Sequence, residues 1–321
     1  MVTRDNISLK TQRFPWVLLV RVPYFPTTAF YIERALQKIT NVVSLSFYFP
    51  LLYRLQYRFY RQRFWIKLTE YIFSNYVRNT GMAHAPDLVL VVDPMRFYVD
   101  WKKLFGQDCI TAFYAIDSHL DDSRRLHITW ARAHEYDYLF VAQKNYLEFY
   151  KRHGAKKVHW LPLACDPEIH RKYNTPIKYD ISFVGNVLGD RPLYLNKLKE
   201  EFPRSFIGRA YLRDMALIYS ASKIVFNRSL NRDLNMRIFE TMSCGRLLMT
   251  DFVQGLDEFF KDKVHLVTYF SLEDLIDKVK YYLEHEQERE EIAMRGMDEV
   301  HSKHTYLHRV REILKVTRII N

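Results

Sequence analysis

The stretch KIVFNRSLNRDLNMRIFETMSCGRLLMTD, residues 223–251, determines the fold class of this protein. Its first part, KIVFNRS (223–229), is an apolar run that ends in polar residues, which is typical of a buried strand. NMRIFETMSCG (235–245) has helical spacing and ends in a glycine, as helices commonly do. RLLMTD (246–251) is a second apolar strand. This order of elements predicts a parallel strand–helix–strand unit.

The same alternation continues on both sides of this stretch. In the first half, the strand-like runs span 16–22, 42–48, 87–93, 109–116, 136–142 and 158–164. In the second half, they span 179–186, 204–208, 223–229, 246–251 and 264–270. Helices between strands predict α/β architecture with parallel sheets covered on both faces. Ligands bind such sheets at the carboxyl ends of the strands.

A polar segment with prolines, DPEIHRKYNTPIKYD (166–180), separates the two halves. At about 150 residues per domain, the chain is long enough for roughly two domains. We predict an N-terminal domain over 1–172, with a helical insertion over 51–80, and a C-terminal domain over 173–321. A cleft is expected between them. We expect the last helix to pack back on the N-terminal domain.

Composition excludes several classes of protein. Hydrophobic residues make up 48% of the chain and charged residues 26%, which excludes a disordered chain. Cys109, Cys165 and Cys244 are far apart, so we expect neither a disulfide framework nor a cysteine zinc site. No apolar stretch approaches the ~18 residues of a membrane span, and the N-terminus lacks the features of a signal peptide. We therefore expect a cytoplasmic protein.

Positive charge is concentrated in the first half. Residues 1–172 carry a net charge of +10 and residues 173–321 one of +1. This asymmetry suggests that the first half meets a nucleic acid, a lipid headgroup surface, or an acidic or phosphorylated substrate. Charge that serves only solubility is the alternative.

Much of this charge lies in LLYRLQYRFYRQRFWIK (51–67). On a helix, Arg54, Arg58 and Arg61 share one face, beside an apolar face and an aromatic border, as in helices at a membrane interface. Together with Trp65, they form our candidate acceptor or membrane surface. A helix packed on the core with a solvated arginine face is slightly favoured over this interpretation. Binding of single-stranded nucleic acid ranks third.

Two segments of the second half carry candidate binding residues. The loop FVGNVLGDRP (183–192) opens a helix, whose N-terminus favours phosphate. An ordinary strand-to-helix turn would need the same glycines. In FNRSLNRDLNMRIFETMSCG (226–245), Glu240 can accept two ribose hydroxyls and Arg237 can hold a diphosphate. A surface Glu–Arg pair is the alternative, and for this segment taken alone it is favoured.

Several motifs, in order, resemble a known family. NMRIFETMSCGRLLMTD (235–251), preceded by SKIVFNRS (222–229), is similar to the donor-domain signature of CgeB/YkvP-type glycosyltransferases, a group 1-like family with the GT-B fold. DISFVGN (180–186) and LIDKVKYYLEH (275–285) agree in order, and GAKKVHWLPLACDPEIH (154–170) is similar in the first half. The resemblance covers roughly residues 109–312.

This resemblance implies two Rossmann-like domains facing a cleft, with a nucleotide-sugar bound mainly by the second and an acceptor at the first. Glu240 would hold the ribose, and the diphosphate would be lined by Asn186, Arg191, Asn235 and Arg237. The full set of candidate donor-binding residues is Gly185, Asn186, Arg191, Asn227, Ser229, Asn235, Arg237 and Glu240.

The sequence departs from the family's pattern at two places. Many retaining GT-B enzymes have a glutamate eight residues before the ribose-binding one, where this chain has Arg232. The resemblance therefore does not imply whether the reaction retains or inverts. The loop PYFPTTAF (23–30) also lacks the glycines common after the first strand.

The resemblance also implies that no metal or other cofactor is needed. His301, His304 and His308 have metal-like spacing, but we interpret them as packing or interdomain contacts. The chain contains no G-x-S-x-G or H-E-x-x-H motif, so nothing supports a hydrolase of that type or a metalloprotease.

The segment YAIDSHLDD (114–122) follows a predicted strand at the end that faces the cleft. His119, oriented by a carboxylate such as Asp117, is a usable general base for an acceptor hydroxyl near neutral pH. It resembles the cleft histidine of GT-B enzymes. The alternative, of equal weight, is that Asp121 and Asp122 simply cap the next helix.

These observations predict a glycosyltransferase that moves a sugar from a nucleotide-diphosphate sugar to a hydroxyl acceptor. The acceptor is expected to be a glycan, a lipid-linked molecule or a protein, with peripheral contact at the inner membrane face and no nucleic acid partner. One alternative is a nucleotide-sugar epimerase or hydrolase on the same architecture. Another is a non-catalytic coat or scaffold protein that kept the fold.

Overall fold

The computed structural model describes residues 14–21, 27–46, 67–68, 71–72, 74–77, 85–92, 99–116 and 133–320. The candidate surface residues Arg54, Arg58, Arg61 and Trp65 lie outside the described residues, as do the candidate catalytic residues Asp117 and His119. The candidate donor-binding residues all lie within the described range 133–320.

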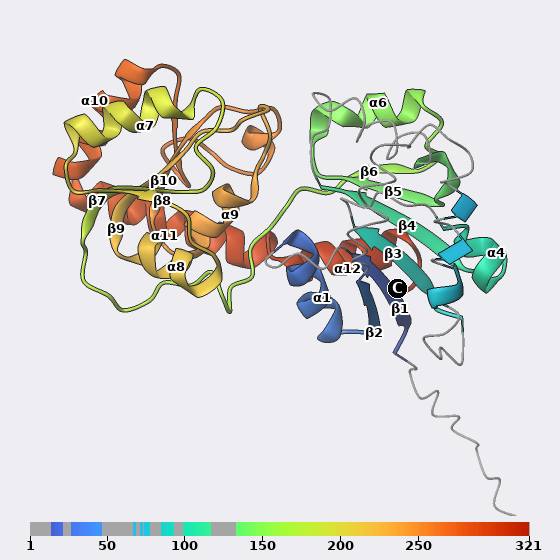
Figure 1. Ribbon diagram of the computed structural model, residues 1–321. Coiled ribbons are helices and arrows are strands. Elements are labelled where there is room, and N and C mark those ends of the chain that lie inside the picture. The colour runs from blue at the N-terminus through green and yellow to red at the C-terminus, as the bar shows by residue number, and fades with distance from the viewer. Residues whose placement is uncertain are drawn as a thin grey trace, which may run out of the picture.

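In the described part of the first half, six strands form one parallel sheet in the order β2-β1-β3-β4-β5-β6 (Figure 1). The strands are β1 (Trp16–Arg21), β2 (Asn41–Ser46), β3 (Leu88–Val92), β4 (Ile110–Ala115), β5 (Tyr138–Val141) and β6 (Val158–Trp160). The helical elements include α1 (Thr28–Gln37), α4 (Trp101–Phe105), η1 (Ala133–Glu135), η2 (Lys144–Tyr146) and α6 (Leu147–Arg152), and the described residues 67–68, 71–72 and 74–77 are helical as well.

The second half forms a parallel sheet in the order β11-β10-β9-β7-β8. Its strands are β7 (Tyr179–Val184), β8 (Ser205–Gly208), β9 (Ser222–Asn227), β10 (Leu247–Asp251) and β11 (Val267–Tyr269). Its helical elements are α7 (Arg191–Glu201), α8 (Leu212–Ser220), α9 (Met236–Ser243), η3 (Leu256–Glu258), α10 (Leu272–Glu284) and α11 (Glu286–Lys303). Helices α7 and α10 cover one face, and α8 and α9 lie on the other (Figure 1).

The strands inside each sheet are continuous apolar runs because helices cover both faces of the sheet. Every residue of β3, with the sequence LVLVV, is buried. Every residue of β10, LLMTD, is buried as well. A strand buried on both faces needs apolar side chains at successive positions rather than at alternate ones. The predicted α/β organisation with two parallel sheets is confirmed.

The last helix, α12 (Tyr306–Val316), runs from the second half to the first and packs against α1 (Figure 1). The Tyr306 ring stacks on Tyr31 of α1, with ring centres 5.3 Å apart and planes 7° apart. Buried Arg309 donates from Nε to the Pro162 carbonyl at 2.8 Å and from Nη2 to the Leu163 carbonyl at 3.3 Å. This helix therefore fastens the second half to the segment 161–178 that connects the sheets.

Candidate functional site

A cavity of about 170 Å³ opens at the carboxyl ends of β7 and β8. Its walls come from the loops after these strands, from α8 and α9, and from α1 of the first half. It is lined by Tyr31, Val184, Gly185, Asn186, Arg209, Ala210, Tyr211, Leu212, Met215, Met236 and Glu240. The cavity therefore brings together Gly185, Asn186 and Glu240 of the predicted donor site, at the edge where parallel sheets bind ligands.

Glu240 is a buried carboxylate in the wall of this cavity. Only 4% of the residue is exposed, although α9 places it beside the opening. Within the part of the chain that the structure describes, no group donates a hydrogen bond to its carboxylate oxygens, and His170 Nε2 lies 3.6 Å from Oε1. Burial raises the pKa of Glu240 to about 7, against the opposing charge of Arg237. A buried carboxylate without donors is costly, so this arrangement suits a ligand that brings hydroxyl groups.

Arg237 lies directly behind Gly185 in the cavity wall. Its Nε donates to the Val184 carbonyl at 2.9 Å and its Nη1 to Asn227 Oδ1 at 2.6 Å. The guanidinium carbon lies 4.5 Å from the centre of the Phe183 ring. A Cβ atom at position 185 would overlap Arg237 Nη2, so only glycine fits there without a shift of the guanidinium. The fixed guanidinium places a positive charge immediately behind the wall.

Arg191 links two loops near the cavity by hydrogen bonds. Its guanidinium donates to the Asn186 carbonyl at 2.9 Å and twice to the Arg228 carbonyl, at 2.8 and 2.6 Å. Burial lowers the pKa of Arg191 to about 10, so the side chain remains charged at neutral pH. The Ser229 N–H donates to Oδ1 of Asp251, at the end of β10, at 2.9 Å. Arg191 and Ser229 thus support the loops and are not among the residues that line this cavity.

Asn235 precedes α9 and has a side chain without a partner. It occupies the N-cap position, but its side chain does not cap the first turn. Both polar atoms of its amide are buried without a hydrogen bond among the described residues. Buried polar atoms are rarely left unpaired in native proteins, which favours contact with a ligand at the start of α9.

Among the lining residues with polar side chains, three were not identified from the sequence: Arg209, Tyr211 and Tyr31. Arg209 and Tyr211 directly follow β8, so the rule that ligands bind at the carboxyl ends of strands could have found them. The next residue, Leu212, has a φ of +51°, which is uncommon for a residue with a side chain and marks a strained turn in the wall. The third, Tyr31, belongs to the buried face of α1, and no sequence signal separates it from the core.

The three histidines near the C-terminus make packing and capping contacts. His304 packs among three phenylalanine rings. His301 Nε2 lies 2.9 Å from Ser243 Oγ, and His308 completes a capping box with Thr305 at the start of α12. Across the described ranges, no three His, Cys, Asp or Glu side chains converge as a metal site would require.

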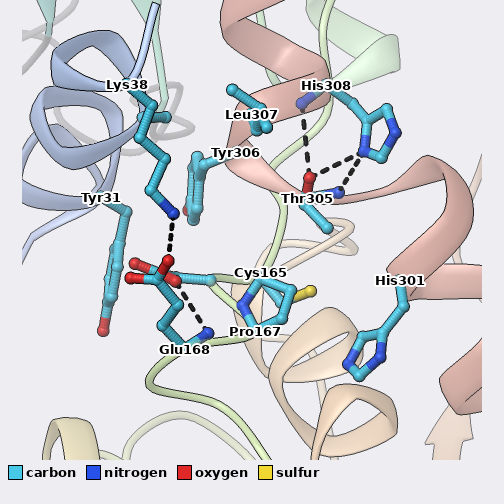
Figure 2. A pocket seen from close by; sticks show the side chains of 12 residues that line it. Tyr31, Lys38, Cys165, Pro167, Glu168, His301, Thr305, Tyr306, Leu307 and His308 are labelled. Carbon is cyan, nitrogen blue, oxygen red and sulfur yellow. Dashed lines mark hydrogen bonds and ion pairs between the residues drawn. The ribbon is translucent and has the colours of Figure 1, made fainter.

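A second cavity, of about 250 Å³, lies between α1, the connecting segment and the start of α12 (Figure 2). Lys38, directly after α1, pairs with Glu168 of the connecting segment, with Nζ 2.5 Å from Oε1. Tyr31 lines this cavity as well as the one at Glu240. Tyr31 therefore stands where the two halves of the chain meet.

A basic groove of about 430 Å³ lies at the amino ends of β5 and β6. It is lined by Tyr138, Lys151, Lys156, Lys157, Val158, His159, Val316 and Arg318. None of these residues is acidic, so part of the positive charge of the first half is gathered here. No helix in the described ranges combines the length and the hydrophobicity needed to cross a membrane.

Comparisons with known proteins agree with this architecture. A family model described as glycosyl transferase-like matches residues 174–315. The crystal structure of Anabaena HepE in complex with UDP and glucose has a TM-score of 0.66 at 11% identity, over 95% of this chain and 100% of that one. A glycosyltransferase from Rickettsia africae has a TM-score of 0.65 at 11% identity, over 96% and 98%. Sucrose-phosphate synthase from Thermosynechococcus elongatus has a TM-score of 0.63 at 11% identity, over 95% and 98%.

These comparisons define the class of fold. The chain has the two-sheet α/β architecture of GT-B glycosyltransferases, as predicted. Its second half, residues 174–315, is similar to glycosyl transferase-like proteins in sequence as well. No curated protein sequence matches the chain.

Proposed function

We propose that this protein is a glycosyltransferase that moves a sugar from a nucleotide-diphosphate sugar to a hydroxyl group of an acceptor. Glu240 carries the proposal, because it is a buried carboxylate without donors in a cavity at the carboxyl ends of β7 and β8. The two hydroxyls of a nucleotide ribose supply the missing donors. HepE complexes with UDP-glucose and with UDP make the uridine nucleotide the first candidate.

The diphosphate is proposed to lie at the start of α9. The unpaired amide of Asn235 and the helix N-terminus supply hydrogen-bond donors there. Arg237 adds a positive charge behind the wall. These groups would stabilise the charge that develops on the departing diphosphate, so we expect the reaction to need no metal.

The remaining parts of the proposal rest on the sequence. His119, oriented by Asp117, is the proposed general base for the acceptor hydroxyl. The order of motifs along residues 154–285 supports assignment to the CgeB/YkvP type.

A panel of nucleoside diphosphates tests the proposal by thermal stabilisation in the presence of a chelator. A ligand at 100 times its dissociation constant adds ~2.7 kcal/mol of stability. We expect one base to stabilise the wild type and Glu200→Gln, a control on the surface of α7 whose side chain is 72% exposed. The same nucleotide should not stabilise Glu240→Gln.

The outcomes of this panel separate the alternatives. Transfer assays with the selected nucleotide-sugar follow a positive result. Consumption of the donor without an acceptor, giving free sugar or an isomer, would instead identify a hydrolase or an epimerase. If no nucleotide stabilises the wild type, the proposed glycosyltransferase function loses its main support, and a non-catalytic coat or scaffold protein is favoured.

We also propose an acceptor that is anionic or lies at a membrane surface, since the first half carries most of the net charge. We expect co-sedimentation with vesicles of anionic lipid at low salt that weakens at about 0.5 M salt, where charges are screened. Changing Arg54, Arg58 and Arg61 to Glu tests whether the predicted helix over 51–67 binds the vesicles. Changing Lys156 and Lys157 to Glu tests whether the basic groove binds them.

Vesicles of neutral lipid are the lipid control for this experiment. Lys199→Glu with Lys261→Glu, two exposed positions on the second half, is the matched control for charge. Binding that does not respond to salt, or that survives both sets of first-half substitutions, would refute the proposed surface.

A further inference from the structure

His170 is a fully buried imidazole in the segment that connects the two sheets. Its Nδ1 accepts a hydrogen bond from the backbone N–H of Asp166 at 3.1 Å. An imidazole that accepts at Nδ1 carries its proton on Nε2. Burial lowers the pKa of His170 to about 3, so the ring is neutral at physiological pH. The ring therefore offers one N–H, at a defined atom.

The Nε2 atom of His170 lies at the junction of the two halves. It is 3.1 Å from the Tyr31 hydroxyl on α1 and 3.6 Å from Oε1 of Glu240 on α9. Burial raises the pKa of Tyr31, so its hydroxyl also keeps its proton. The one N–H of this imidazole is therefore donated to the Tyr31 hydroxyl, and the Glu240 carboxylate lies just beyond hydrogen-bond distance of it.

Tyr31 is itself held firmly on α1. Its ring stacks on Tyr306, as Figure 2 shows beside the second cavity. Arg34, one turn further along α1, pairs with Asp166 at 2.8 Å and with Glu168 at 2.7 Å. These contacts hold α1 against the connecting segment and so fix the position of the Tyr31 hydroxyl.

We propose that His170 and Tyr31 are positioning residues, which orient the Glu240 carboxylate toward the ribose hydroxyls of the donor. The inference rests on the proposed nucleotide-binding function. His170 donates its one N–H to the Tyr31 oxygen, which leaves the Tyr31 O–H free, among the described residues, to donate within the cavity that Tyr31 and Glu240 both line. Neither carboxylate oxygen of Glu240 is occupied by a hydrogen bond from His170, so both can accept from the ribose. Donor affinity then depends on the contact between the two halves, because neither residue belongs to the second sheet or its helices.

The test compares UDP, or the base that the panel selects, with its 2′,3′-dideoxy analogue by calorimetry. His170→Phe removes the N–H but keeps a planar ring, and Tyr31→Phe removes only the hydroxyl. We expect either change to weaken binding of the ribonucleotide about tenfold or more and to leave binding of the dideoxy analogue unchanged. His170→Gln keeps an amide N–H and is expected to recover the affinity.

Tyr114→Phe is the matched control. It also removes a buried hydroxyl, which donates to the Leu161 carbonyl of the connecting segment at 2.8 Å, but Tyr114 does not line the cavity. In Tyr114→Phe, the ratio of the affinity for the ribonucleotide to that for the dideoxy analogue should therefore stay at the wild-type value. If His170→Phe and Tyr31→Phe weaken the binding of both nucleotides equally, or weaken neither, this inference is overturned while the proposed function stands. A wild type that binds no nucleotide overturns the proposed function and this inference with it.

Discussion

The variant Glu240→Gln is expected to be more stable than the ligand-free wild type at pH 8, by about 3 kcal/mol. The pKa of this carboxyl rises from 4.5 to about 7 on folding, chiefly through burial. The folded state therefore favours the protonated acid. That preference stabilises the wild type fully below pH 4.5 and is lost as the pH rises through 7. Glutamine is neutral throughout, so the variant avoids the cost of the buried charge.

The same variant is expected to lose roughly 100-fold in nucleotide affinity, because the neutral amide keeps one acceptor oxygen and places an NH2 donor where the carboxylate has its second acceptor. Gain of stability together with loss of binding is the signature of a carboxylate kept for a ligand. Urea unfolding at pH 4 and pH 8, with Glu200→Gln as the exposed control, measures the first effect. The advantage should be present at pH 8 and absent at pH 4. A variant less stable than the wild type at pH 8 would show that the carboxylate already has a partner.

Substitution of Arg309 by methionine is expected to destabilise the protein by about 3 kcal/mol. The residue is 4% exposed, and its guanidinium donates to the carbonyls of Pro162 and Leu163 on the connecting segment. Methionine fills the space of the side-chain stem but donates nothing. Loss of charged hydrogen bonds, with a buried carbonyl left unpaired, accounts for the size of the effect.

Arg311→Met is the matched control, because Arg311 is exposed on the same helix two residues further on. Urea unfolding at neutral pH should show a change within about 0.5 kcal/mol for this control. Equal midpoints for the two variants would contradict the view that Arg309 fastens α12 to the connecting segment.

The strands and helices of the second half could be predicted because their signals are local. The segment 223–251 forms β9, α9 and β10 as expected. Gly245 follows α9 with a φ of +61°, the left-handed conformation that a glycine after a helix supplies. Burial on both faces demands apolar side chains at successive strand positions, so the parallel sheets are visible in the sequence.

The candidate site could be predicted only where its residues follow a strand or begin a helix. Glu240, Asn186 and Gly185 line the cavity and were found in this way. The direction of a side chain was not predictable. Arg191 was expected at the diphosphate, and the structure shows that three of its five N–H groups are donated to the Asn186 and Arg228 carbonyls, in the loops after β7 and β9.

The sequence by itself determined the alternating elements, the two parallel sheets and the segment that carries Glu240, because each depends on spacing within a few turns or strand residues. Tertiary structure alone decided that Tyr31 and His170 meet Glu240. Both have the pattern of ordinary buried residues, and their contact joins positions 31, 170 and 240. Only the packing of α1 and α12 across the connecting segment brings such distant positions to one carboxylate.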